Sequence, residues 1–270
     1  MEEKIRLDIL LIKKELAKSR ELAKEIICTG NVFCNGKCAK KPSEKYLYDT
    51  LIEVKSNVLK YVSRGGLKLE KAIEMYNIDL TDCICMDIGA STGGFTDCML
   101  QNGAKKVYAV DVGYNQLDKK LLNDIRVINL EHTNIRYLKE NDIKDKIDFF
   151  SVDVSFISLN LVLPNVKKFL HDNSYGLLLV KPQFEAGKSN VGKKGVVKDI
   201  KVHINVLKGV YDFIIKLGCS VINATFSPIK GPEGNIEYLY YIKNSQNESI
   251  DFNAIIKMAE NSHLNFSKER

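Results

Sequence analysis

Charged side chains border apolar runs at three places in the second half of this 270-residue chain. Asp153 and Lys181 each end a run typical of a buried strand, and Glu237 lies within another. A charge at the margin of an apolar core is costly unless it is paired, and ligands of doubly wound sheets bind beyond the carboxyl ends of the strands. We therefore predict that these residues line a site able to hold and accept a proton. A purely structural salt bridge between Lys181 and Asp153 is the alternative.

A glycine-rich turn precedes these residues in the chain. An apolar stretch runs into Gly89-x-Ser91-x-Gly93-Gly94, and a helical pattern follows. Such glycines let backbone N–H groups approach a ligand, and Asp111, 22 residues past Gly89, is placed to accept a ribose hydroxyl. The turn also matches the nucleophile elbow of hydrolases, with Ser91 as nucleophile, and a turn that serves packing is a third interpretation.

A lysine near the start of a predicted helix adds to this set. Lys68 follows Arg64-Gly65-Gly66 and lies in the first turns of that helix, where a cation gains nothing from the helix dipole. This placement indicates a residue kept for function. An ordinary surface lysine is the alternative.

Length and composition are those of an ordinary globular protein with a moderate basic excess. The chain is 45% hydrophobic and has a formal charge of +6, so an anionic partner is plausible. Residues 1–60 hold 13 Lys and Arg against 9 Asp and Glu, a net of +4. Most of the excess therefore lies in the first fifth of the chain, which predicts an N-terminal contact surface.

Cysteine usage and hydropathy exclude several classes of protein. Seven cysteines at irregular spacings indicate a reducing compartment, and we expect a cytoplasmic location. Cys34 and Cys38 flank a hairpin turn with no second ligand pair after them, so no metal site is expected. The acidic start lacks a signal peptide, and no run approaches the ~18 to 20 apolar residues of a membrane span.

The first 54 residues predict a small α+β unit. Residues 6–29 read as two short amphipathic helices, with Ser19 as the N-cap of the second. Asn35-Gly36 predicts a tight hairpin, and residues 51–54 read as a closing strand.

The second half predicts a doubly wound α/β sheet of seven strands. Alternating apolar runs and helical patterns place the strands near residues 83–88, 106–110, 126–129, 147–153, 176–181, 219–226 and 236–242. The last two runs are separated by a loop with no room for a crossover helix, so the final strand should be antiparallel. This is the arrangement of methyltransferases that use S-adenosylmethionine (SAM).

Spaced stretches at the N-terminus resemble the S4 RNA-binding domain over roughly residues 5–54. The matching stretches are Arg6-Leu7-Asp8, Ser19-Arg20-Glu21-Leu22-Ala23, Gly30-Asn31-Val32 and Val32-Phe33-Cys34-Asn35-Gly36-Lys37. The resemblance implies docking on structured RNA through phosphate contacts and shape. The residues expected to contact RNA are Arg6, Lys18, Arg20, Lys24, Lys37 and Arg64.

The chain order Lys68, Asp153, Lys181, Glu237 resembles the catalytic tetrad of FtsJ-like 2'-O-ribose methyltransferases. A wider match, over about residues 5–242, resembles the TlyA family. Its motifs here are Ser63-Arg64-Gly65-Gly66-x-Lys68-Leu69, Asp87-Ile88-Gly89-Ala90-Ser91-Thr92-Gly93-Gly94-Phe95-Thr96-Asp97, Asp111-Val112-Gly113-Tyr114, Asp153-Val154-Ser155-Phe156-Ile157-Ser158, Lys181-Pro182-Gln183-Phe184-Glu185 and Gly231-Pro232-x-Gly234-Asn235-x-Glu237.

The TlyA resemblance implies an enzyme and its substrate. Members of that family, sometimes labelled hemolysins, are cytidine 2'-O-methyltransferases that act on the RNA of both ribosomal subunits. Lys181 is then the expected base, oriented by Asp153, while Glu237 positions Lys68 or the ribose. The residues expected to bind SAM are Asp87, Gly89, Ala90, Ser91, Thr92, Gly93, Gly94, Asp111, Val112, Asn134 and Asp153.

The expected organisation is an S4-like domain over residues 1–59, a methyltransferase domain over 60–243 with a linker at 60–63, and a C-terminal tail over 244–270 that forms a peripheral helix. The expected partner is ribosomal RNA within its subunits, with no membrane and no obligate protein partner. Two rival functions stay open, a non-catalytic RNA-binding or ribosome-assembly factor and a hydrolase built on Ser91. A pore-forming role finds no membrane-spanning segment to support it.

Overall fold

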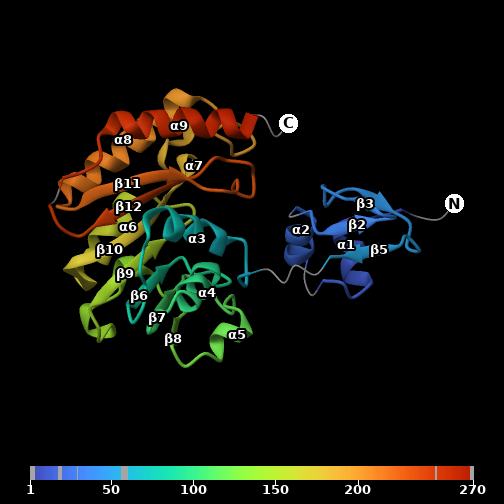
Figure 1. The fold of residues 1–270 in the computed structure, drawn as a ribbon, viewed down its shortest axis with the longest axis horizontal. Helices are drawn as coiled ribbons and strands as arrows, with labels where there is room; N and C mark the ends of the chain where they lie inside the picture. Colours follow the sequence, from blue (N-terminus) through green and yellow to red (C-terminus); the bar gives the residue numbers. More distant parts are fainter. Residues whose placement is uncertain (1–3, 18–19, 29, 56–59, 247, 268–270) are drawn as a thin grey trace. The chain divides into compact units, whose positions relative to one another are not determined.

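The computed structural model describes residues 4–17, 20–28, 30–55, 60–246 and 248–267. The chain divides into two compact units, Met1–Lys60 and Tyr61–Arg270, each with its own buried core (Figure 1). The finer division expected at residues 59 and 243 stays a prediction.

The smaller unit packs two helices against a small sheet. Its elements are α1 (Leu7–Lys13), α2 (Arg20–Cys28) and a sheet of β2 (Val32–Cys34), β3 (Lys37–Cys38) and β5 (Ile52–Val54), with a separate pair of β1 (Ile5–Arg6) and β4 (Lys45–Tyr46). Asn35 and Gly36 join β2 to β3 with φ angles of 50° and 75°, as the predicted tight hairpin requires. The expected N-cap, Ser19, lies outside the described residues.

A mixed sheet forms the centre of the larger unit. Its strands are β6 (Ile84–Ile88), β7 (Lys106–Val110), β8 (Val127–Leu130), β9 (Ile147–Val152), β10 (Leu170–Val180), β11 (Ser220–Phe226) and β12 (Tyr238–Lys243). Among the described residues they form one seven-stranded sheet in the order β11-β12-β10-β9-β6-β7-β8, with β12 antiparallel to both neighbours (Figure 1). The predicted fold class is confirmed.

Helices cover both faces of this sheet. One face packs against α3 (Gly65–Tyr76), α4 (Gly94–Gln101) and α5 (Lys119–Leu122), and the other against α6 (Leu159–Val166), α8 (Ile200–Lys216) and α9 (Phe252–Ser267). Shorter helical segments are α7 (Pro182–Glu185), η1 (Ile135–Tyr137), η2 (Glu140–Asp142), η3 (Lys167–Phe169) and η4 (Lys188–Asn190). Along β10, Leu177 and Leu179 belong to the core on the α3 face of the sheet. Leu178 and Val180 belong to the core on the α8 face, so the strand is apolar on both faces.

Helix α9 lies in the segment expected as a C-terminal tail. It packs on α8 and β11, and its Ile255 and Ala259 side chains are fully buried in the core of that face. The final helix is thus an integral part of the larger unit.

A buried carboxylate joins three elements beneath the glycine turn. Asp87, in β6, is 1% exposed and accepts hydrogen bonds from Thr96 Oγ1 of α4 at 2.7 Å and Ser151 Oγ of β9 at 2.8 Å. Burial raises the pKa of Asp87 to about 6, against the opposing effect of the two hydroxyl groups. Ionised Asp87 therefore ties β6 to α4 and β9 beside the glycine turn, and the burial of its charge lowers the free energy of unfolding.

Stability should decrease across the pH range in which Asp87 ionises. Because its folded pKa is raised above the unfolded value, the folded state binds the proton more tightly between about pH 4 and pH 6, and the free energy of unfolding falls as pH rises through that range. Asp87→Asn removes this loss. Between pH 4.5 and pH 7, urea unfolding should show the stability of the variant relative to wild type rising by about 2 kcal/mol. A pH-independent difference would contradict this, and Asp251→Asn, on the surface, is the control.

Candidate active site

The glycine turn lies against the end of the neighbouring strand. Gly89 has a φ of 83°, and a Cβ at this position would lie 2.3 Å from the carbonyl oxygen of Asp153. Gly94 begins α4, where a Cβ would lie 2.3 Å from Ser63 Oγ. Glycine is needed at both positions because the backbone approaches so closely.

A first cavity, of about 700 Å³, opens beyond the carboxyl ends of β6, β7 and β9. Asp111 lies in its wall and accepts the backbone N–H groups of Ser91 at 2.8 Å and Gly113 at 2.7 Å. A carboxylate held by two N–H groups keeps lone pairs free for hydroxyl donors. The position matches the ribose-binding carboxylate of nucleotide-binding sheets.

The predicted cofactor residues fall into two groups. Those that line the first cavity are Gly89, Ser91, Asp111, Val112, Asn134 and Asp153. Ala90 is buried, Thr92 is exposed, and Gly93 and Gly94 lie at the start of α4. Asp87 lies beneath the turn, where its carboxylate bonds hydroxyl groups of the protein itself.

The four predicted catalytic residues come together. Lys68 Nζ of α3 lies 2.7 Å from Glu237 Oε2, just before β12, and 3.5 Å from Asp153 Oδ2, just after β9. Lys181, just after β10, places its Nζ 2.5 Å from Asp153 Oδ1. Their side chains are between 1% and 19% exposed. The charges alternate in sign along this chain of contacts, which we call the tetrad.

Pairing fixes the charge of two members of the tetrad. Burial opposes the charged form of Lys68, but the attraction of Asp153 and Glu237 is stronger and raises its pKa. Burial likewise opposes ionisation of Asp153, but Lys68 and Lys181 outweigh it and lower its pKa. Lys68 is therefore a fixed cation and Asp153 a fixed anion at neutral pH.

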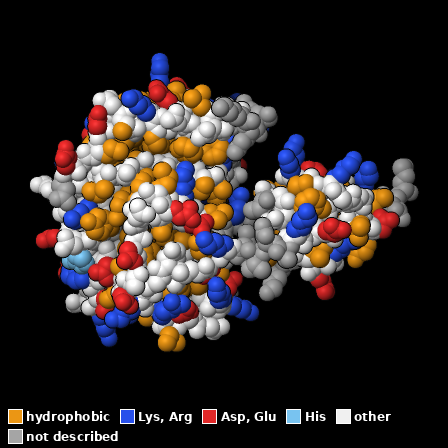
Figure 2. Space-filling view, viewed as in Figure 1, with side chains coloured by type: hydrophobic (Ala, Val, Ile, Leu, Met, Phe, Trp, Pro, Cys, Tyr) orange, Lys and Arg blue, Asp and Glu red, His pale blue; other side chains and the backbone are white. Residues whose placement is uncertain are grey.

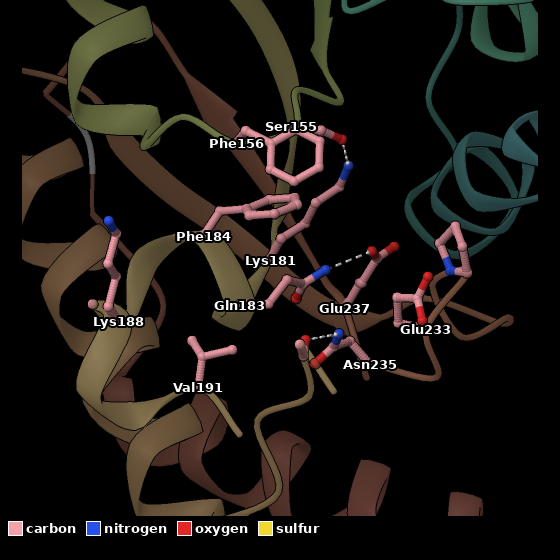
Figure 3. Close-up of a pocket in the computed structure, with 13 residues that line it drawn as sticks. Ser155, Phe156, Lys181, Gln183, Phe184, Lys188, Val191, Glu233, Asn235 and Glu237 are labelled. Carbon is pink, nitrogen blue, oxygen red and sulfur yellow. Dashed lines mark hydrogen bonds between the residues drawn. The ribbon is translucent and has the colours of Figure 1, made fainter. Parts of the chain in front are cut away.

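A second cavity, of about 730 Å³, lies beside the tetrad (Figure 3). Lys181 and Glu237 line it, and Gln183 Nε2 donates to Glu237 Oε1 at 3.3 Å. Ser155, Phe156 and Phe184 line both cavities. The tetrad and these side chains therefore separate two spaces, each large enough for a small molecule or a nucleotide.

Sequence reasoning missed several of these residues as site residues. Ser155 accepts a hydrogen bond from Lys181 Nζ at 3.2 Å, and the rings of Phe156 and Phe184 lie 5.0 Å apart. Neutral side chains carry no burial cost that would draw attention to them. Their position directly after Asp153 and Lys181 was the available signal.

The hydrolase interpretation finds no support in the geometry. Among the residues described, no hydrogen bond joins Ser91 to a histidine. His203 is fully buried and bonds Tyr238 Oη at 2.7 Å and the Val197 carbonyl at 3.0 Å, and His263 packs edge-on against it. A serine nucleophile needs a histidine within hydrogen-bond reach.

The basic residues predicted to contact RNA occupy different settings. Arg6 donates two hydrogen bonds of 3.0 Å to buried Asp8, and Arg20 Nε donates a third at the same distance. Lys24 and Lys37 are exposed on the smaller unit, whose visible face carries several cations (Figure 2). Arg64 is half-buried in the larger unit, and Lys18 lies outside the described residues.

Within the described ranges, no cluster of three His, Cys, Asp or Glu side chains could hold a metal ion. Within the same ranges, no helix has both the length and the apolar character needed to cross a bilayer.

Comparison with known proteins gives consistent matches. Residues 61–244 match the family model of the FtsJ-like methyltransferase, and residues 5–47 match the S4 domain. The chain is 47% identical to YqxC of Bacillus subtilis, provisionally named an rRNA methyltransferase, over 99% of this chain and 97% of the relative. It is 39% identical to the 16S/23S rRNA (cytidine-2'-O)-methyltransferase TlyA of Mycobacterium tuberculosis, over 93% and 94%. A solved structure from Streptococcus thermophilus, labelled a hemolysin, matches with a TM-score of 0.80 at 46% identity, over 100% and 99%.

Loss of the Lys68 charge alone should destabilise the protein more than loss of the Lys68 and Glu237 charges together. Lys68→Met leaves Glu237, 1% exposed, without its cation, so the free energy of unfolding should fall by about 3–5 kcal/mol. Lys68→Met combined with Glu237→Gln removes both charges and should recover part of that loss. Urea unfolding followed by circular dichroism measures both.

Lys208→Met, which breaks an exposed pair with Asp212 on α8, is the matched control and should cost less than about 1 kcal/mol. Equal costs for Lys68→Met and the control, or additive costs in the double variant, would contradict a tightly paired network.

Proposed function

We propose, from the premise that this chain belongs to the TlyA family of FtsJ-like methyltransferases, that it transfers a methyl group from SAM to a ribose 2'-hydroxyl of ribosomal RNA. The position of the tetrad between two cavities carries the proposal. A methyl donor on one side and a hydroxyl on the other would meet at Lys181 and Asp153.

The residues of the first cavity suit SAM. Because Gly89 has no side chain, the cofactor can come close to its backbone. The Asp111 carboxylate can accept hydrogen bonds from the hydroxyls of the cofactor's ribose, and Asn134 lies in the same wall for the adenine. Ionised Asp153 lies in the same wall and offsets the positive charge of the sulfonium. When bound there, SAM supplies an activated methyl group.

The second cavity would receive the ribose. The Lys181 amine would accept the proton that leaves the 2'-hydroxyl as the oxygen gains the methyl group. Asp153 and Ser155 hold the Lys181 amine by bonds of 2.5 and 3.2 Å. Lys68 keeps its proton and stays beside Glu237, so it supplies a fixed positive charge near the reacting oxygen. Alignment of the reacting groups should provide most of the acceleration.

The RNA substrate is proposed from the smaller unit and the relatives. An S4 domain and exposed Lys24 and Lys37 favour binding to phosphates of structured RNA. The Mycobacterium tuberculosis relative is named for cytidine in 16S and 23S rRNA, and we extend cytidine and both ribosomal subunits to this chain.

Methyl transfer itself tests the proposal. Purified protein with radiolabelled SAM and unmodified small and large subunits should yield RNA with a new alkali-resistant linkage at a cytidine, since 2'-O-methylation blocks cleavage. Lys181→Ala should lower the rate by about 10²–10⁴-fold. Lys181→Arg, which keeps the charge but holds its proton, should be equally impaired.

Lys208→Ala, an exposed lysine of α8, serves as the control and should keep wild-type activity. Full activity in Lys181→Arg would contradict the role of Lys181 as the base. An unchanged linkage map with intact subunits would contradict the proposed methylation of ribosomal RNA. Binding of SAM and RNA without transfer would favour the non-catalytic assembly factor.

Exposed lysines of the smaller unit should set the salt dependence of RNA binding. Lys24→Ala with Lys37→Ala removes two cations placed for phosphate contact, so the slope of log affinity against log salt should become shallower by about 1 to 2. Filter binding to ribosomal RNA at several salt concentrations measures the slope, and SAM affinity should not change. Lys208→Ala with Lys216→Ala makes the same charge change on α8, and an equal effect there would contradict a specific role.

A further inference from the structure

Phe156 occupies an unusual position between the two cavities. Its side chain is 90% exposed, lines both cavities and lies 5.0 Å from the ring of Phe184. Its φ of 62° is in the left-handed region, which a bulky residue adopts only when its surroundings hold it there. Because the Phe156 ring is exposed to solvent, few packing contacts are available to hold this backbone angle. Hydrogen bonds of the neighbouring residues must therefore fix the backbone.

Glu185 fixes the backbone just after Phe156. It ends α7 and uses both carboxylate oxygens: Oε2 accepts from Ser158 Oγ at 2.7 Å and Oε1 accepts the backbone N–H of Leu159 at 2.8 Å. Ser158 and Leu159 form the start of α6. Glu185 therefore acts as a second cap on that helix, supplied by a different segment of the chain.

Residues 153–159, after β9, and residues 181–185, after β10, contact each other at three places. Lys181 bonds Asp153 and Ser155 at one end, Phe184 packs on Phe156 in the middle, and Glu185 bonds the start of α6 at the other end. Phe156 is thus held between fixed points on both sides. Glu185 lines neither the first nor the second cavity, so it can affect them only through the residues that it holds.

We propose that Glu185 is a positioning residue: by accepting hydrogen bonds from Ser158 and Leu159 it holds Phe156 as the wall shared by the two cavities. The proposal rests on the proposed function in so far as the cavities receive SAM and RNA. Without the carboxylate, residues 154–158 can relax to ordinary backbone angles, and Phe156 leaves the wall.

Kinetics of Glu185→Ala and Glu185→Gln test this role. The alanine variant should lower kcat/KM for the RNA about 100-fold, because a displacement of about 1 Å near reacting groups has effects of that size. Its affinity for SAM, measured by calorimetry, should fall about 10-fold. The glutamine variant keeps a carbonyl acceptor for the Leu159 N–H and an amide beside Ser158, so it should recover most of the activity.

Asp251→Ala is the matched control. Asp251 accepts the backbone N–H of Asn253 at the start of α9, away from the residues that line the two cavities. This variant loses a helix cap at the surface, and its kcat/KM and SAM affinity should stay at wild-type values.

A double variant tests whether Glu185 acts through Phe156. In a Phe156→Ala background, Glu185→Ala should reduce kcat/KM by less than about 3-fold, because the wall is already absent. A full 100-fold loss in that background, or wild-type kinetics in Glu185→Ala alone, would overturn the proposal. If wild type transfers no methyl group but Glu185→Ala still weakens SAM binding relative to Asp251→Ala, the proposed reaction fails and the positioning role stands.

Discussion

Four charges of alternating sign, three of them on buried residues and the fourth on partly buried Asp153, govern the architecture of the larger unit. The tetrad draws one residue each from α3, the end of β9, the end of β10 and the start of β12. Taking such charges out of water is favourable only when each has its partner, so the four segments must meet with a precision that apolar packing alone does not demand. Gly89 extends the constraint to the turn, because its missing side chain lets that turn contact the backbone at Asp153.

The same constraint divides the space above the sheet. Because the tetrad and the side chains after Asp153 and Lys181 form a shared wall, each cavity borders the other across these side chains. The first cavity presents the carboxylates of Asp111 and Asp153, the second presents two lysine amines and two glutamate carboxylates, and two aromatic rings line both. Such an arrangement suits the transfer of a small group between two bound molecules.

Strands and charged site residues were predictable because both follow simple energetic rules. Parallel strands covered on two faces read as continuous apolar runs, and a charge at their ends needs a partner. The early part of β10 escaped prediction because His171, Asp172 and Asn173 look like a loop, and the short pair of β1 and β4 carries no periodicity. Asp87 belongs to the glycine motif, yet its contacts with Thr96 and Ser151 depend on the folded strands. Neutral residues such as Ser155 and Gln183 acquire their roles only from three-dimensional contacts.

Strand β12 has the latest sequence position in the sheet but an interior place, paired with β10 on one side and β11 on the other. During synthesis, β10 and β11 emerge first and cannot pair with each other across the vacant slot. Lys68, made more than 160 residues earlier, meets Glu237 only when that slot is filled. Until β12 is made, Lys68 has Asp153 but lacks Glu237, and the edges of β10 and β11 that β12 occupies are open. The last residue of the tetrad and the strand that closes the sheet are thus neighbours in the chain.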